Sequence, residues 1–209
     1  MKLKTLAAKC KRDGVFRLYD RRGEDGNIYE QWLGTGAAAY PLHGLPLLDE
    51  SHIIALFELT EKQLEKISIY HHDELPPAIS IEDACPGEKL LDREEMTLAY
   101  GKYIVRPIMT SDGLELIDNE HMAVLADVAD NLELYERRME SGQIYFAAKM
   151  GLLLVGVIMP LNLIEEEFVE AVETIARNAR TAFINKGERK AQREADSGQM
   201  TLDEGGGEA

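Results

Sequence analysis

GLPLLDESHIIALFE, residues 44–58, returns 69 positions later as GLELIDNEHMAVLAD, residues 113–127. Six of the fifteen aligned positions are identical, whereas unrelated segments of average composition would share about one. The sequence therefore predicts two copies of one supersecondary unit. We expect each copy to be a β-hairpin followed by a helix, and the fold class to be α+β with antiparallel sheets and packed helices.

Both copies carry the same local signals. Strands are predicted on either side of His43-Gly44 in the first copy and of Ser111-Asp112-Gly113 in the second. Asp49 and Asp118 follow at positions where a helix would begin, and each can accept a hydrogen bond from the free amides of the first turn. We therefore predict that both aspartates are helix caps.

The helices of the two copies are predicted to differ. In the second copy, Leu125, Val128, Leu132, Tyr135 and Met139 recur every three or four residues, which predicts one helix through Met139. In the first copy the helix is interrupted at Leu59, and a fresh capping box begins at Thr60.

The rest of the chain completes the predicted organisation. We expect a first α+β unit over 1–73, a proline-containing linker over 74–95, a second α+β unit over 96–185 and a disordered polar tail over 186–209. The first unit begins with a basic helix that ends at Asp13-Gly14. The second unit also contains a hairpin over 144–159, whose last arm is predicted to be a central strand. A helix capped by Asn162 then follows, with an inner face made of Phe168, Val172, Ile175, Ala179 and Phe183.

Charge is unevenly distributed along a chain whose net charge is −15. Residues 1–22 carry +6 and residues 177–193 carry +5, whereas residues 23–176 carry −21 and residues 194–209 carry −5. If the two basic segments converge, they can contact the phosphate backbone of DNA. The simpler alternative is that these cations only solvate two helices. The candidate nucleic-acid-binding residues are Lys2, Lys4, Lys9, Lys11, Arg12, Arg177, Arg180, Arg189 and Lys190.

Composition restricts the class of protein. The longest apolar run, residues 151–160, is about half of the ~20 residues that cross a bilayer, and no signal-peptide pattern is present at the N-terminus. Cys10 and Cys85 lie far apart without metal-ligand spacing. We therefore expect a cytoplasmic protein with no membrane partner and no cofactor.

Asp-x-x-His, which occurs at Asp49/His52 and at Asp118/His121, invites a second hypothesis. One helical turn brings a carboxylate and an imidazole onto one face, so two copies could form a metal site or the centre of a hydrolase. The alternative is that the aspartates are caps and the histidines pack in the first turn. No common signature of nucleophilic, nucleotide-dependent or metalloprotease catalysis occurs in the sequence, which favours a protein that is not an enzyme.

Two further segments are candidate partner-binding sites. Trp32 and Tyr40 precede the first repeat and could anchor an interface, or they could lie in the core. The tail sequence Gln199-Met200-Thr201-Leu202-Asp203 is similar to the peptides by which bacterial proteins dock on the replication sliding clamp, in which a glutamine and a leucine make the contacts. The usual aromatic residue at the end of that motif is replaced by Asp203.

Two stretches of the chain resemble known families. One resemblance is to an uncharacterised family carried in prophages and mobile elements of gut Firmicutes. It rests on the run Trp32-x-Gly34-x-Gly36-x-Ala38-x-Tyr40-Pro41-Leu42, on the following Gly44-Leu45-Pro46-x-Leu48-Asp49-Glu50, and on residues 132–137 and 151–154. This resemblance covers residues 1–185 and implies a genetic setting among replication and recombination genes. In addition, Gly44-Leu45-x-Leu47 followed by Asp49-x-Ser51-His52-Ile53 is similar to a pattern of DNA sliding clamps, which are acidic, repeated α+β proteins with basic helices facing DNA. The clamp pattern requires a strand over 52–59, whereas the second copy predicts a helix.

Together these observations predict a non-enzymatic binding protein that acts as an accessory in phage or mobile-element DNA replication or recombination, with a sliding-clamp-like protein as one form of that role. Its expected partners are DNA through the basic helices, replication proteins through the tail, and a second copy of the chain. A metal-binding protein or hydrolase and a structural or regulatory dimer remain as alternatives.

Overall fold

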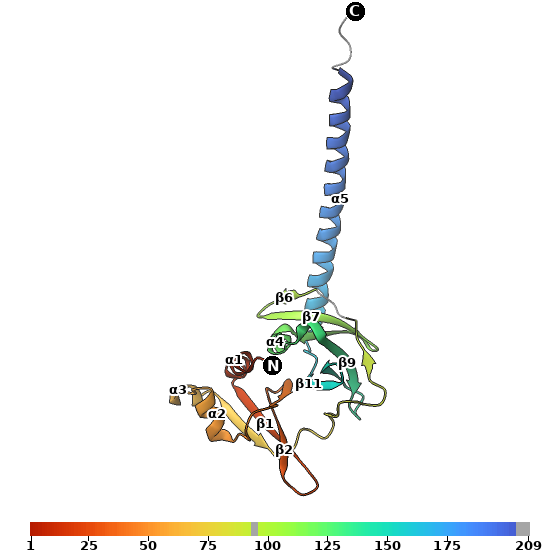
Figure 1. Ribbon diagram of the computed structural model, residues 1–209. Coiled ribbons are helices and arrows are strands. Elements are labelled where there is room, and N and C mark those ends of the chain that lie inside the picture. Colours follow the sequence, from red (N-terminus) through yellow and green to blue (C-terminus); the bar gives the residue numbers. More distant parts are fainter. Residues whose placement is uncertain (93–95, 204–209) are drawn as a thin grey trace, which may run out of the picture. The chain divides into compact units, whose positions relative to one another are not determined.

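The computed structural model describes residues 1–92 and 96–203, with side chains described as far as Lys190. The chain divides into two compact units, Met1–Asn162 and Leu163–Ala209. The first unit contains two sheets and several short helices, and the second contains the long helix α5 (Glu166–Asp203) (Figure 1). The predicted α+β class is confirmed.

The larger sheet has eight described strands and draws on both halves of the first unit. Its order is β4-β1-β2-β3-β11-β10-β9-β5. Only the β1–β4 pair is parallel among the described pairs of this sheet. Its strands are β1 (Val15–Arg22), β2 (Ile28–Gly34), β3 (Ala38–Pro41), β4 (Ser68–His72), β5 (Lys89–Leu90), β9 (Leu132–Arg138), β10 (Ile144–Met150) and β11 (Leu153–Ile158).

This sheet joins the segments that the sequence assigned to separate units. β3 pairs with β11, with Ala38 opposite Ile158, so the boundary predicted between 73 and 96 does not divide the fold. The predicted linker 74–95 contributes β5, which pairs with β9. β11 lies between β10 and β3, and the predicted central strand is therefore confirmed.

The smaller sheet consists of β6 (Leu98–Tyr100), β7 (Tyr103–Thr110) and β8 (Gly113–Asp118). The β7–β8 hairpin is the one predicted around Ser111-Asp112-Gly113, and Thr110 pairs with Gly113 across its turn. Asp118 ends β8 and caps α4 (Asn119–Val124).

The short helices begin and end where local chemistry requires. Gly14, with a φ of 70°, ends α1 (Leu3–Asp13), because a left-handed residue there costs glycine little. Asp49 caps α2 (Glu50–Leu56) by accepting a hydrogen bond from His52 N at 2.9 Å. Thr60 and Gln63 form the predicted capping box of α3 (Glu61–Leu64). Residues 50–56 are thus helical, whereas the clamp pattern has a strand over 52–59.

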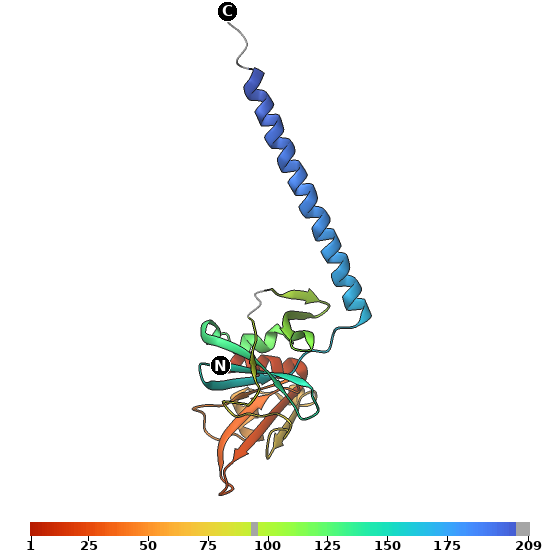
Figure 2. The same ribbon diagram turned by 90° about the vertical axis from the view of Figure 1, so that its right-hand side faces the viewer.

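A separate cluster of buried hydrophobic residues packs on each face of the larger sheet. On one face, Phe16, Leu18 and Phe146 are fully buried together with Leu6 and Cys10 of α1. α1 lies across this face beside α4 (Figure 2). On the other face, Tyr19, Trp32, Tyr145 and Val157 form the second cluster. Neighbouring residues of one strand, such as Leu18 and Tyr19, therefore enter different clusters.

Several predictions are corrected by tertiary contacts. The helix predicted through Met139 ends at Val124, and residues 132–138 form β9 because they pair along their whole length with β10. Residues 45–48 are not a strand, so the hairpin is present only in the second copy and the repeat is not confirmed beyond an aspartate-capped short helix. α5 begins at Glu166 and continues to Asp203, through residues for which the sequence predicted disorder.

Candidate functional site

The predicted nucleic-acid-binding residues of α1 are divided between surface and interior. Lys2 and Lys4 are exposed. Lys9 is 7% exposed, and its Nζ atom lies 2.9 Å from Asp118, 3.0 Å from Asp13 and 3.4 Å from Glu120. Lys9 therefore cannot reach a phosphate without breaking buried ion pairs.

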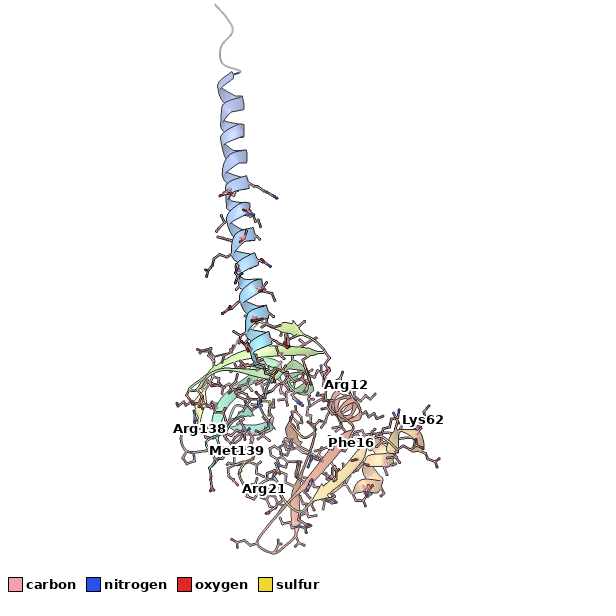
Figure 3. All side chains as sticks on the ribbon, turned by 180° about the vertical axis from the view of Figure 1, so that it is seen from behind. Arg12, Phe16, Arg21, Lys62, Arg138 and Met139 are labelled. Atoms are coloured by element: carbon pink, nitrogen blue, oxygen red, sulfur yellow. The ribbon has the colours of Figure 1, made fainter. Side chains whose placement is uncertain are left out.

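The other two cations of α1 also contact the protein itself. Lys11 Nζ donates to the carbonyl of Phe57 at 2.7 Å. Arg12, labelled in Figure 3, forms an ion pair with Glu120 at 2.5 Å while remaining 58% exposed. Lys9, Lys11 and Arg12 thus attach α1 to α2 and α4.

The second Asp-x-x-His lies in this same network. Burial acts to raise the pKa of Asp118, but hydrogen bonds from Lys9 and from the Glu120 backbone N–H outweigh it and lower the pKa. His121 is 3% exposed, and burial, together with the charge of Lys9, lowers its pKa to about 4. Its backbone carbonyl accepts a hydrogen bond from Tyr40 OH at 2.9 Å. His121 is therefore a neutral core residue.

The first Asp-x-x-His is exposed. A hydrogen bond from Ser51, together with the His52 backbone N–H, lowers the pKa of Asp49 to about 2. His52 Nδ1 lies 2.9 Å from Asp49 within the capping box. Among the described residues, no group of three or more His, Cys, Asp or Glu side chains could hold a metal ion. Asp49, His52, Asp118 and His121 therefore do not assemble a metal centre there.

The predicted aromatic partner site is part of the core. Trp32 is 1% exposed and donates from its indole to Glu30 at 2.9 Å. Tyr40 is fully buried between the sheet and α4. Tyr40 lies in the core cluster on one face of the larger sheet and Trp32 in the cluster on the other face, so neither side chain is available to a partner.

A buried carboxylate lies on β1, beside β4, and was not identified from the sequence. Asp20 is 1% exposed and accepts hydrogen bonds from Gln31 Nε2 at 2.7 Å and Arg22 at 3.1 Å. His71 Nε2 lies 2.9 Å from the same carboxylate. Among the described contacts, no hydroxyl or thiol reaches His71.

A pocket lies where α4 meets β7 and β9. It has a volume of about 490 Å³. Its apolar walls come from Ile108 on β7, Met122 and Ala123 on α4, and Leu132 and Leu134 on β9. The segment that contains β5 closes another side with Leu90 and Leu91.

A few polar groups lie among these apolar walls. Arg106 Nη2 donates to Asn119 Oδ1 at 3.3 Å, and both residues line the pocket. Asp92 and Glu133 also line it, and Glu133 accepts a hydrogen bond from Tyr135 OH at 2.9 Å. An apolar interior with a small number of oriented polar groups is the usual construction of a small-molecule site.

Sequence reasoning missed this pocket because it depends on the identity of one element. Residues 132–134 were predicted to be helical, and only as strand β9 do Leu132 and Leu134 face α4 and β7 together. The turn sequence Glu140-Ser141-Gly142 was the available signal for a β9–β10 hairpin, and Gly142 adopts a φ of 86° there.

The remaining predicted residues belong to α5. Arg177, Arg180, Arg189 and Lys190 are exposed on it. Gln199 and Leu202 are within its helical range, but their side chains lie outside the described residues.

Comparisons of the chain with protein-family models, with curated proteins and with solved structures gave no match. Among the described residues, none of the helices combines the length and the apolar character that a membrane span requires.

Proposed function

We propose that this chain is a non-enzymatic binding protein and that the pocket between α4, β7 and β9 takes a small ligand with an apolar body and one oxygen acceptor. The observation that carries the proposal is the pocket itself, since about 490 Å³ falls within the range of small-molecule sites. Its chemistry defines the ligand class more closely than its volume does.

The apolar walls favour an aliphatic or aromatic body. The ligand can bury apolar surface against Ile108, Leu132 and Leu134. Removal of this surface from water contributes a favourable free energy of about 25 cal/mol per Å². The guanidinium of Arg106, oriented by Asn119, is suited to a carboxylate or a carbonyl oxygen. Glu133 and Asp92 act against a ligand of high negative charge, which favours a single carboxylate over a phosphate.

Fluorescence titration with 8-anilinonaphthalene-1-sulfonate, followed by displacement with decanoate, tests this proposal. Ala123→Phe fills the pocket, whereas Ala99→Phe places the same side chain on an exposed position of β6. We expect saturable binding that weakens about tenfold or more in Ala123→Phe and is unchanged in Ala99→Phe. Equal affinities in wild type and Ala123→Phe, with unchanged melting temperatures, would overturn the proposal.

The head-group contact is tested separately. Arg106→Met should weaken displacement by decanoate about tenfold while leaving displacement by decanol, which lacks a carboxylate, unaltered. An equal loss for both compounds would mean that Arg106 shapes the pocket and does not recognise the head group.

A second candidate function is the accessory role in DNA metabolism, and the exposed cations support it. Lys2 and Lys4 at the start of α1, with Arg177, Arg180 and Arg189 on α5, are exposed. Fluorescence anisotropy with single- and double-stranded oligonucleotides across a salt series tests this role. Each phosphate contact removed by Lys→Gln or Arg→Gln should reduce the salt slope by about 0.9 on duplex DNA. No binding at low salt would exclude direct DNA contact.

A further inference from the structure

The larger sheet ends at β4, whose outer side faces no other described strand. Among the described strands β4 pairs only with β1, to which it is parallel. The amide of Ser68 donates to the carbonyl of Gly14 at 2.9 Å, so the main chain of Ser68 faces β1. Because these groups alternate along a strand, Tyr70 also faces β1, whereas Ile69 and His71 direct their N–H and C=O groups away from it.

The other sheet edges that the structure describes are short, charged or covered. β5 has two residues, one of them Lys89, and β6 has three residues. β8 carries Glu115, and the carbonyl of Leu116 already accepts a hydrogen bond from the amide of Leu161 at 2.7 Å. β4 (Ser68–His72) has five residues and no bulge in its pairing with β1. It also lacks the lysine, proline or acidic residue by which natural sheets prevent pairing at an edge.

The chemistry of this edge selects the kind of partner. A row of main-chain donors and acceptors is satisfied together by another extended main chain, which adds a strand to the sheet. A helix such as α5 cannot supply these hydrogen bonds, because it uses its main-chain groups internally. The phosphate backbone of DNA offers acceptors but no donors. The occupant that fits is therefore a β-strand.

We propose that β4 pairs with β4 of a second copy of this chain, in antiparallel orientation, about a two-fold axis at Tyr70. Ile69 of each copy then lies opposite His71 of the other, and each such pair exchanges two main-chain hydrogen bonds. The outward groups of both residues are thereby satisfied. The two Tyr70 side chains, each 45% exposed in the single chain, meet at the axis as a cross-strand aromatic pair.

Charge favours a second copy and the antiparallel direction. β4 carries no lysine, arginine, aspartate or glutamate, so two acidic chains can approach there without contact between like charges. Asp73 and Glu74 follow the strand, and Lys66 precedes it. Antiparallel copies separate the two Asp73 residues by about 20 Å along the strands and place each acidic end beside the Lys66 end of the other copy. Parallel copies would instead bring the carboxylates together.

The two-fold arrangement is closed, because both copies use the same edge and no free edge remains at the junction. The pairing also goes beyond the proposed ligand pocket. β9, which forms one wall of that pocket, lies near the opposite end of the sheet from β4. The pairing and the pocket are therefore independent of each other, and either can fail without the other.

Sedimentation velocity of the full chain over a range of concentrations tests the pairing. We expect a reversible monomer–dimer equilibrium in the wild type. Tyr70→Lys and Tyr70→Glu should each weaken it about tenfold or more, because like charges then lie directly opposite each other. An equimolar mixture of the two variants should associate again, since opposite charges face each other across the axis.

Tyr29→Lys is the matched control. Tyr29 is 58% exposed on the inner strand β2, and the guanidinium of Arg21 lies 5.3 Å from its ring centroid. Arg17 lies over Tyr70 in the same way, at 5.1 Å. Tyr29→Lys should therefore remove a similar cation–π contact from the single chain but leave the dimer unchanged. A monomer at every concentration, a dimer that both Tyr70 variants leave intact, or a mixture that associates no better than each variant alone would overturn the pairing.

Amide hydrogen exchange measured residue by residue locates the interface. In dilute samples the outward amides of Ile69 and His71 should exchange rapidly, and they should become protected as the concentration rises. The amide of Tyr70, which faces β1, should be protected at both concentrations. A dimer in which the amides of Ile69 and His71 still exchange rapidly would place the contact elsewhere and overturn the pairing through β4.

Discussion

Lys9 Nζ lies 2.9 Å from Asp118 Oδ2, and the two side chains are only 8% and 6% exposed. The pair attaches α1 to the residue that caps α4. From the sequence, Lys9 was a candidate phosphate ligand and Asp118 a candidate metal ligand. In the folded protein each neutralises the other, and both predicted functions are replaced by a structural one.

Lys9→Ala should lower the free energy of unfolding by about 3 kcal/mol, because removing one member of a buried pair leaves Asp118 charged and without its ammonium partner. Lys4→Ala, on the exposed face of the same helix, should change it by less than about 0.5 kcal/mol. Urea denaturation of both variants measures the difference. Equal effects would show that the Lys9 network contributes no specific stability.

The buried imidazole of His121 should make the free energy of unfolding depend on pH. Burial lowers its pKa from 6.5 to about 4, so the unfolded chain binds a proton more readily than the folded chain between these values. The contribution of a neutral His121 to the free energy of unfolding is therefore fully present above pH 6.5. The free energy of unfolding should fall by up to about 3 kcal/mol as the pH decreases to 4.

Thermal unfolding of wild type and His121→Leu between pH 7.5 and 4 measures this effect. The variant should lose most of the slope in that interval, whereas His52→Leu, at an exposed cap, should retain it. A wild-type slope that persists in His121→Leu would assign the titration to another group.

Gly34 and Gly36 lie two positions apart, but only Gly36 has space for a side chain. A Cβ atom on Gly34 would lie 1.9 Å from the carbonyl oxygen of Ala38, a backbone contact that cannot move without separating β2 from β3. Gly34→Ala should therefore destabilise by more than about 4 kcal/mol or prevent folding. Gly36→Ala meets nothing within 4 Å and should be tolerated. Circular dichroism and melting of the two variants decide between strand packing and a general need for glycine in this turn.

Arg137 holds the segment before β5 against the sheet. Its guanidinium, on a residue that is 2% exposed, donates to the carbonyls of Ser80 and Glu82 at 3.1 and 2.9 Å and to Glu88 at 2.8 Å. Arg137→Met should cost about 2 kcal/mol and increase amide hydrogen exchange across residues 80–88.

The neighbouring arginine provides the control for this measurement. Arg138 lies on the same strand but contacts Ser111 and Asp112. Arg138→Met should increase exchange near residues 111–112 and leave 80–88 protected. Uniform changes in both variants would indicate a general loss of stability instead of local attachment.

Elements with a local cause were predicted correctly from the sequence. Gly14 ends α1, Asp49 and Thr60 begin α2 and α3, and the β7–β8 turn lies at Ser111-Asp112. Each depends on the conformational freedom of one residue or on a side chain that reaches a backbone amide in the next turn. None of them requires knowledge of the rest of the chain.

The same reasoning failed where the spacing of apolar residues in one segment fits both a helix and a strand. Leu125, Val128, Leu132 and Tyr135 fit a helix, while Leu132 and Leu134 with the turn at Gly142 fit a hairpin strand. The backbone hydrogen bonds of β10 decide in favour of the strand. The pocket depends on that decision, and so it was not predicted.

The sequence by itself determined the composition of this protein's surfaces and the ends of its helices: an acidic body, two basic segments and aspartate caps at Asp49 and Asp118. Only the tertiary structure decided which charges are available to a partner. Lys9 forms an internal ion pair because Asp118 lies beside it, although the two are 109 positions apart along the chain. Arg177 and Arg180 remain exposed on α5. Charge is a property of each residue, but its use depends on which residues folding brings within a few ångströms.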